Sequence, residues 1–199
     1  MAVSNKGDAT RAATSAVSTD IGRDIRAIRQ SRGMTLTEMS ASLGRSIGFL
    51  SQVERGISSL STEELRQVAQ LFGVPVSWFL VLSDVSEAER GLITRSGLRR
   101  MSGATGDGLV EELLSPDLGG SYEMIRSVFA PGARLERPVR RMTEETAYLV
   151  SGKLDIRIGD HFFTVQAGDC FRFKEEKFSW ENNYDEPAVA LWVISPPIY

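Results

Sequence analysis

Residues 33–56 read GMTLTEMSASLGRSIGFLSQVERG, a pattern that predicts two short helices joined by a tight turn. Thr35 can cap the first helix, and Glu38, three residues later, can complete a capping box with it. Gly44 ends that helix, and Ser46 is a good cap for the second one. Two short helices around a glycine-containing turn form a helix-turn-helix, whose second helix is sized for a DNA major groove.

The order of residue types in this stretch adds a family resemblance. The segment SLGRSIGFLSQVERG is similar to the recognition segment of the lambda-repressor-like family, also called the XRE family. The resemblance implies a five-helix DNA-binding domain over residues 20–82. It also implies DNA contacts from Thr35, Arg45, Ser46, Ile47, Gly48, Phe49, Gln52 and Arg55.

Three of these residues are expected to face base edges. Gln52 can form two hydrogen bonds with adenine, and Ile47 can contact a thymine methyl group. Gly48 departs from the polar residue often found at its position, so we expect little base readout there. The resemblance also matches Arg29 and Glu54 to a buried ion pair, whose role we expect to be architectural.

Apolar residues at helical spacing predict the remaining helices of this domain. A first helix has the inward residues Ile21, Ile25 and Ile28. A fourth helix, capped by Ser61, has the inward residues Leu65, Val68, Ala69 and Phe72. A short fifth helix after Pro75 carries Trp78, Phe79 and Leu80.

Charge limits how this domain can bind DNA. The whole chain of 199 residues has a net charge of −3, which is unlike a general polyanion binder. Residues 20–82 hold seven Arg, no Lys and six acidic residues, a net charge of +1. Such a module should bind weakly alone and gain affinity as a homodimer on the two half-sites of a palindromic operator.

The composition of the chain indicates where in the cell the protein is expected. No apolar run approaches the roughly 20 residues that a membrane span needs, and no signal peptide is visible. A single cysteine fits a reducing cytoplasm, and we expect Cys170 to be a buried, inert thiol rather than a redox sensor. The expected location is therefore cytoplasmic, without a membrane partner.

Two segments lack clear periodicity. Residues 1–19 are rich in Ala, Ser and Thr, which predicts a disordered tail. Residues 83–106 are predicted to be a linker that enters the second domain as an edge strand. Four arginines in this linker, Arg90, Arg95, Arg99 and Arg100, are expected on a solvated face, with proximity to DNA as the alternative.

Residues 107–199 contain short β-rich runs divided by turn signals such as Pro131-Gly132 and Gly168-Asp169. The order PGA…EETAYLVSGKLDIRIGD…VQAGDCFRF…NNYDEPAVALWVISPP resembles the cupin family, which implies a small jelly-roll barrel. The predicted fold class is therefore α + β in separate domains. The ten basic and sixteen acidic residues of this segment give a net charge of −6, so it should not touch DNA.

Cupin chemistry normally depends on a metal held by three His and one Glu. Here the matching positions hold Pro138, Arg140, Glu145 and either Phe178 or Ser179. One carboxylate beside an arginine is a poor site for a divalent ion. We therefore expect no metal, no cofactor and no enzymatic activity.

The predicted barrel interior offers a different function. Arg140, Glu145, Phe178 and Trp180 form a candidate effector site for a small molecule, for example one with a carboxylate and an amine. The alternative is that Arg140 and Glu145 pair with each other while the two aromatic residues fill the core.

A helix-turn-helix followed by a cupin is similar to a group of bacterial transcription regulators. In that group the β-domain senses a metabolite and often supplies the dimer contact. We therefore expect a DNA-binding regulator such as a repressor, with activation left open. One alternative is a repressor whose cupin only dimerises, and another is a cupin enzyme with an accessory DNA module, which the missing histidines disfavour.

Overall fold

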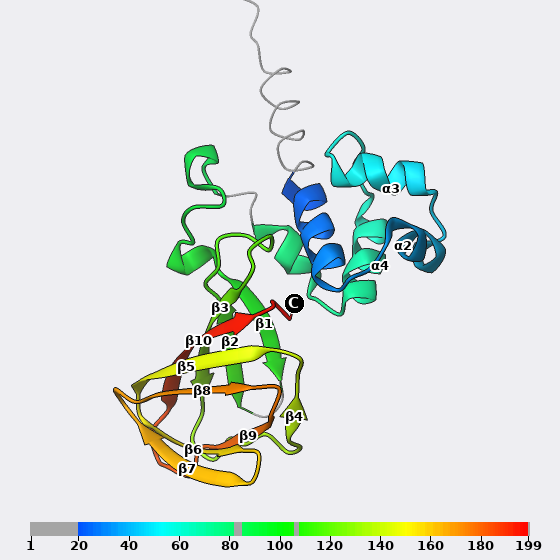
Figure 1. Cartoon of the computed structure of the whole chain (residues 1–199). Coiled ribbons are helices and arrows are strands. Elements are labelled where there is room, and N and C mark those ends of the chain that lie inside the picture. Colours follow the sequence, from blue (N-terminus) through cyan, green and yellow to red (C-terminus); the bar gives the residue numbers. More distant parts are fainter. Residues whose placement is uncertain (1–19, 82–84, 106–107, 199) are drawn as a thin grey trace, which may run out of the picture. The chain divides into compact units, whose positions relative to one another are not determined.

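The computed structural model describes residues 20–81, 85–105 and 108–198 (Figure 1). The predicted disordered tail, residues 1–19, lies outside the described residues. The chain forms two compact units. The helical unit runs to Ile93 and includes Asp117–Gly119, and the β unit comprises Thr94–Pro116 and Gly120–Ile198.

The helical unit contains four α-helices and two short 3-10 turns among the described residues. They are residues 20–31, α2 (Leu36–Leu43), α3 (Ile47–Glu54), α4 (Thr62–Phe72), η1 (Val76–Phe79) and η3 (Glu87–Glu89). Its core holds the apolar residues Ile25, Ile28, Met39, Leu50, Val53, Leu65, Val68, Ala69, Phe72, Trp78 and Phe79. All four inward residues predicted for α4 are buried, which confirms that helix and its phase.

Local side chains explain where α2 begins and ends. The hydroxyl of Thr35 accepts a hydrogen bond from Glu38 N, and Glu38 Oε2 accepts one from Thr35 N. This reciprocal pair confirms the predicted capping box. Gly44 ends the helix at φ 63°, a left-handed conformation that glycine adopts without steric cost. Ser46 then caps α3 by accepting from Phe49 N.

The predicted short fifth helix after Pro75 is a single turn of 3-10 helix, η1, and not an α-helix. Its hydrogen bonds run from Trp78 N to Pro75 O and from Leu80 N to Ser77 O, each 3.0 Å long and spanning three residues. Four residues are too few for an α-helical ladder. The turn is instead held by burial of Trp78 and Phe79.

The β unit contains ten strands in two antiparallel sheets. They are β1 (Arg100–Thr105), β2 (Leu109–Leu113), β3 (Glu123–Phe129), β4 (Val139–Arg140), β5 (Glu144–Ser151), β6 (Lys153–Ile158), β7 (His161–Gln166), β8 (Cys170–Lys174), β9 (Lys177–Glu181) and β10 (Ala188–Ser195). The six-stranded sheet has the order β1-β2-β3-β10-β5-β8, and the four-stranded sheet has the order β4-β9-β6-β7. The 3-10 turn η4 (Ser96–Leu98) precedes β1.

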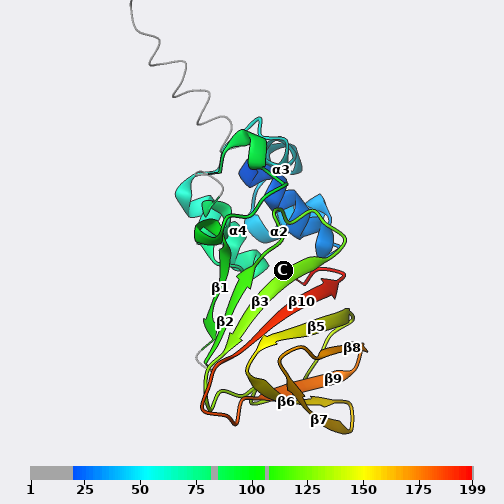
Figure 2. The ribbon, with the colours of Figure 1, turned by 90° about the vertical axis from the view of Figure 1, so that its left-hand side faces the viewer.

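The core of the β unit lies between these two sheets (Figure 2). Alternate residues of each strand point into it, as Ala188, Ala190, Trp192 and Ile194 do on β10. The predicted barrel is not closed by strand pairing within the described residues, because the named strands form two separate sheets. The observed architecture is therefore a two-sheet sandwich.

Of the four linker arginines expected on a solvated face, Arg95 is exposed as expected, whereas Arg90, Arg99 and Arg100 are partly or fully buried. Arg90 lies 2.9 Å from Asp20 in the helical unit, and Arg99 lies 2.7 Å from Glu112 in the β unit. Arg100 is buried. Cys170 was expected to be buried, but it is exposed on β8.

Candidate functional site

The recognition helix α3 has one buried face and one exposed face. Leu50 and Val53 pack into the core, whereas Gly48 and Gln52 are exposed and Ile47 is 46% exposed. No atom lies within 4 Å of where a Cβ of Gly48 would be. The exposed face of the first two turns therefore presents the apolar side chain of Ile47, the exposed backbone at Gly48 and the side-chain amide of Gln52.

Ser58, just beyond α3, orients the side chain of Gln52. Its hydroxyl donates a 2.9 Å hydrogen bond to Oε1 of Gln52. This contact fixes the amide and leaves its two N–H groups directed elsewhere. Ser58 was missed by sequence reasoning because the chain returns to Gln52 through the turn after α3, where Ile57 N also bonds Gln52 O.

The other predicted DNA contacts surround the start of α3 but are partly engaged within the protein. The hydroxyls of Thr35 and Ser46 serve as N-caps. Arg45 forms a 2.8 Å ion pair with Glu64, although half of its side chain remains exposed. Their availability to DNA is therefore lower than the sequence pattern predicts.

Two further predicted contacts lie on the body of α3 and at its C-cap. Phe49 is half-buried, so only part of its ring is accessible. Arg55 is exposed, and its Nε donates a 3.1 Å hydrogen bond to Ser51 O. That contact holds the stem of the side chain and leaves the end of the guanidinium accessible.

A buried ion pair fixes α3 to the helix over residues 20–31. Arg29 Nε lies 2.6 Å from Glu54 Oε1, and Arg29 Nη2 lies 3.0 Å from Glu54 Oε2. The hydrogen bond to Glu54 raises the pKa of Arg29, so the guanidinium stays charged. The predicted pair is confirmed. Beside it, a Cβ on Gly22 would lie 2.1 Å from Val53 O, so the two helices approach closely.

The structure does not bring the four predicted effector residues together. Arg140 is exposed, and its Nε donates a 2.7 Å hydrogen bond to Glu175 O. Phe178 and Trp180 are 4% and 5% exposed and belong to the packed core. Phe178 stacks on Phe173 at 4.6 Å between ring centroids.

Glu145 is buried beside the neighbouring arginine rather than Arg140. Arg141 Nη1 lies 3.6 Å from Glu145 Oε1, which also accepts a 2.7 Å hydrogen bond from the Thr143 hydroxyl. The predicted alternative, a pair between Arg140 and Glu145, is therefore also wrong. The strand β4 ends at Arg140, so the alternation of side chains does not continue to Arg141.

Two more carboxylates point into the same interior. Glu123 on β3 is 2% exposed and accepts a 3.0 Å hydrogen bond from Ile198 N. Glu111 on β2 accepts a 3.1 Å bond from the hydroxyl of the buried Ser127. The pKa of Glu123 is raised to about 7, mainly by burial and also by the nearby Glu111 and Glu145, while Ile198 N and Arg141 act in the opposite direction.

The strand register places two of these carboxylates in one row. Ile194 on β10 lies opposite Glu123 on one side and Glu145 on the other. Because each strand spacing is about 4.8 Å, their Cα atoms are about 10 Å apart. Both glutamates were detectable in the sequence as charges in phase with inward apolar residues, but only the register joins them.

Near this row lies a buried donor with no hydrogen-bond partner among the described residues, Nε1 of Trp192. Trp192 is two residues from Ile194 on the same inward face of β10. A cavity of about 490 Å³ is lined by Thr143 and Glu175, the contacts of Glu145 and Arg140, and also by Glu144, Thr146 and Val193, which point away from the core on β5 and β10. This volume is within the range of small-molecule pockets.

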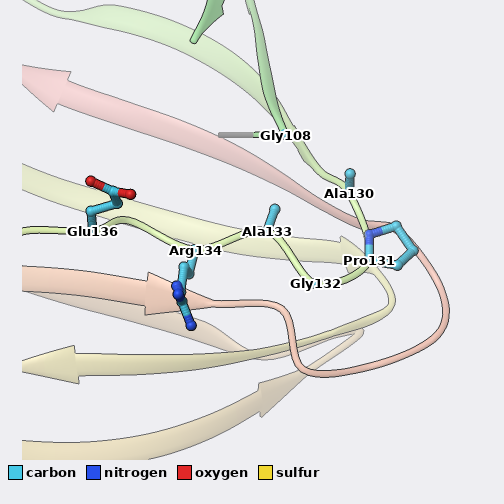
Figure 3. A pocket seen from close by; sticks show the side chains of 7 residues that line it. All are labelled: Gly108, Ala130, Pro131, Gly132, Ala133, Arg134 and Glu136. Carbon is cyan, nitrogen blue, oxygen red and sulfur yellow. The ribbon is translucent and has the colours of Figure 1, made fainter. Parts of the chain in front are cut away.

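A second cavity, of about 340 Å³, lies at the Pro131-Gly132 turn (Figure 3). Its side chains are small except for Arg134 and Glu136. None of the predicted effector residues lines it, so it has no part in the candidate site.

In the part of the chain that the structure describes, no group of three His, Cys, Asp or Glu side chains is arranged to hold a metal ion. No helix within the same ranges is long and apolar enough to cross a membrane.

Comparison with known proteins agrees with both units. The chain matches the helix-turn-helix family HTH_3 over residues 25–79 and the cupin domain family Cupin_2 over residues 125–194. It belongs to the XRE-type helix-turn-helix family of transcriptional regulators and carries a C-terminal cupin domain.

Relatives match different parts of the chain. The transcriptional regulator ClgR of Mycobacterium tuberculosis is 33% identical over 99 residues, which is 48% of this chain and 87% of that protein. An HTH_3 family transcriptional regulator from Vibrio cholerae superposes over 92% of this chain and 98% of that one, with 19% identity and a TM-score of 0.42. The cupin domain of an XRE family transcriptional regulator from Enterobacter cloacae covers 44% of this chain and 96% of that domain, with 22% identity and a TM-score of 0.40.

Proposed function

We propose that this chain is a homodimeric, sequence-specific DNA-binding regulator whose cupin domain binds a small organic effector. The observation that carries the proposal is the division of α3 into a buried face and an exposed face. Leu50 and Val53 fix the helix, and Ile47, Gly48 and Gln52 remain free to meet DNA. This is the geometry by which a recognition helix enters the major groove.

The exposed side chains define how bases are read. Gln52 presents an oriented amide that can bond the N6 and N7 atoms of adenine once its Ser58 contact adjusts. Ile47 can cover a thymine methyl group. The N-terminal end of α3 and Arg55 can bind phosphate oxygens. Because few cations are available in each unit, two half-sites on one palindrome supply the affinity.

The polar interior of the cupin defines the effector class. Glu111, Glu123 and Glu145 lie near one another, and the exposed Arg141 is the cation that acts on them, so a further positive charge would be favourable there. An ammonium group would supply it, and a ligand carboxylate or carbonyl could accept from Trp192 Nε1. The proposed effector is therefore a small molecule with an amine and a hydrogen-bond acceptor.

Of the effector residues predicted from sequence, Glu145 lies at the centre of this proposed site. Arg140 would lie at its exposed entrance, and Phe178 and Trp180 would form part of its apolar wall. Effector binding would regulate DNA affinity by favouring one arrangement of the two helix-turn-helix units in the dimer, with a coupling of about 1–3 kcal/mol.

DNA titration of a base-reading variant tests the first half of the proposal. Gln52→Ala should weaken binding to the preferred site by about 1–3 kcal/mol and leave binding to random DNA nearly unchanged. Gln70→Ala is the matched control, because Gln70 is an exposed glutamine on α4. Equal losses on both kinds of DNA would contradict the role of Gln52.

Thermal-shift screening with amino acids and polyamines tests the second half. A ligand should stabilise the wild type, and Glu145→Gln should abolish that shift. Glu186→Gln is the matched control, because Glu186 is exposed and does not line the cavity of about 490 Å³. If no compound stabilises the protein, the alternative of a cupin that only dimerises is favoured. Turnover of a screened compound would instead favour the enzyme alternative.

A further inference from the structure

The turn after α3 folds the chain back onto the recognition helix. Gly56 lies in the left-handed region at φ 69°, and its N–H donates a 2.9 Å hydrogen bond to Val53 O. Ile57 N and Ser58 N both donate to Gln52 O, at 2.9 and 3.3 Å. This is the Schellman end of a helix, in which glycine takes the left-handed position without steric cost. It fixes the backbone of Ser58 beside Gln52.

The same two residues are joined through their side chains. The hydroxyl of Ser58 donates a 2.9 Å hydrogen bond to Oε1 of Gln52, and Ser58 is half-buried whereas Gln52 is exposed. Because the Ser58 backbone is held by Gln52 O, its hydroxyl is presented from a fixed position. The amide of Gln52 is therefore held in place on the exposed face of α3, and it loses less side-chain freedom when it binds a base.

This hydrogen bond leaves Gln52 the groups that adenine recognition needs. An amide oxygen has two lone pairs and an amide nitrogen has two hydrogens, so the contact with Ser58 uses one lone pair of Oε1 and neither hydrogen of Nε2. In the major groove, adenine offers N6 as a donor and N7 as an acceptor. The amide can therefore accept from N6 and donate to N7 while Oε1 still accepts from Ser58. The contact adjusts on binding without being lost.

We propose that Ser58 is a positioning residue for base recognition, whose hydroxyl holds the Gln52 amide in the orientation that prefers adenine. The inference deepens the proposed function and rests on it for the reading of bases by Gln52. Without the hydroxyl, the amide is free to turn until Nε2 alone faces the groove, where it can donate to N7 and O6 of guanine. Loss of the hydroxyl should therefore lower the preference for adenine over guanine more than it lowers the affinity for DNA.

The hydrogen-bond donors of Ser58 argue against a direct phosphate contact. Serine hydroxyls and backbone N–H groups commonly donate to phosphate oxygens. A serine has one hydroxyl hydrogen and one backbone N–H. Here the first is donated to Gln52 Oε1 and the second to Gln52 O. Neither donor of Ser58 remains for a phosphate oxygen, so the residue acts on DNA through Gln52.

Titration of DNA duplexes that differ at one base pair tests the proposal. The pair is the one at which Gln52→Ala removes the preference for adenine, measured as the Kd of the guanine duplex divided by that of the adenine duplex. In Ser58→Ala this ratio should fall about two- to tenfold, the contribution of one ordinary hydrogen bond. The Kd for random DNA should stay unchanged, which also reports that the helical unit is folded. Ser58→Thr keeps a hydroxyl and should keep the ratio. Ser59→Ala is the matched control, because Ser59 is exposed and next in the chain.

A double variant separates positioning from an independent contact. Once Gln52 is replaced by Ala, adding Ser58→Ala should change neither the ratio nor the Kd for any duplex. An unchanged ratio in Ser58→Ala, or a loss from Ser58→Ala that persists beside Gln52→Ala, would overturn the proposal while leaving the role of Gln52 intact. If Gln52→Ala leaves every base preference as it is in the wild type, the proposed role of Gln52 fails and this inference falls with it.

Discussion

Replacing Arg29 with Met tests how the recognition helix is held. In the wild type, Arg29 makes two hydrogen bonds to Glu54 at 2.6 and 3.0 Å and a third, of 2.7 Å, to Met34 O. The side chains of Arg29 and Glu54 are only 11% and 5% exposed. Arg29→Met leaves the carboxylate buried without its partner, which typically costs about 3–5 kcal/mol.

Urea unfolding of the full chain, followed by circular dichroism at 222 nm, measures this cost. The signal reports the helical unit because the described α-helices all lie in it. Thermal unfolding followed at the same wavelength is a second readout: for a unit of this size each 1 kcal/mol shifts Tm by about 4–8 °C, so the Tm of the variant should be about 12 °C lower or more.

Two controls separate a buried pair from a surface pair. The double variant Arg29→Met with Glu54→Leu should recover most of the stability, because an apolar pair replaces both charges. Arg66→Met removes an exposed pair with Glu63 and should cost less than about 1 kcal/mol. The reasoning is refuted if Arg29→Met costs no more than Arg66→Met.

Three further outcomes are expected. Gly22→Ala should cost about 1–3 kcal/mol in urea unfolding because its Cβ would meet Val53 O, whereas Gly48→Ala on the same assay should be neutral or stabilising, since nothing lies nearby. Because burial raises the pKa of Glu123 from its ordinary 4.5 to about 7, the folded state binds the proton more tightly than the unfolded state. Stability should therefore fall by up to about 3 kcal/mol as the pH rises from 5 to 8, and calorimetry of Glu123→Gln should show a smaller fall. Asn182→Ala should cost about 1–3 kcal/mol by the same calorimetry, because its buried amide holds two backbone carbonyls.

Much of the helical unit could be predicted from the sequence because its signals are local. The capping box of Thr35 and Glu38 and the stop at Gly44 involve residues close together in the chain. The inward residues of α4 follow from spacing alone. The short helix after Pro75 was predicted too, although the pattern did not indicate its 3-10 form.

The interior of the β unit could not be predicted to the same degree, because it depends on register. Which of Arg140 and Arg141 reaches Glu145 is decided by where the two-residue strand β4 ends. Glu123 joins Glu145 only through the pairing of β10 with both neighbouring strands. Short-range pattern carries no information on such contacts.

Selection of DNA from a random pool, followed by footprinting of the selected site, tests most directly whether α3 reads DNA as proposed. The selected sequences should converge on a palindrome, and wild-type protein should protect two half-sites about one helical turn apart. A selected pool that binds no better than the starting DNA, or a protected region without two-fold symmetry at any protein concentration, would contradict the dimeric recognition of DNA through α3.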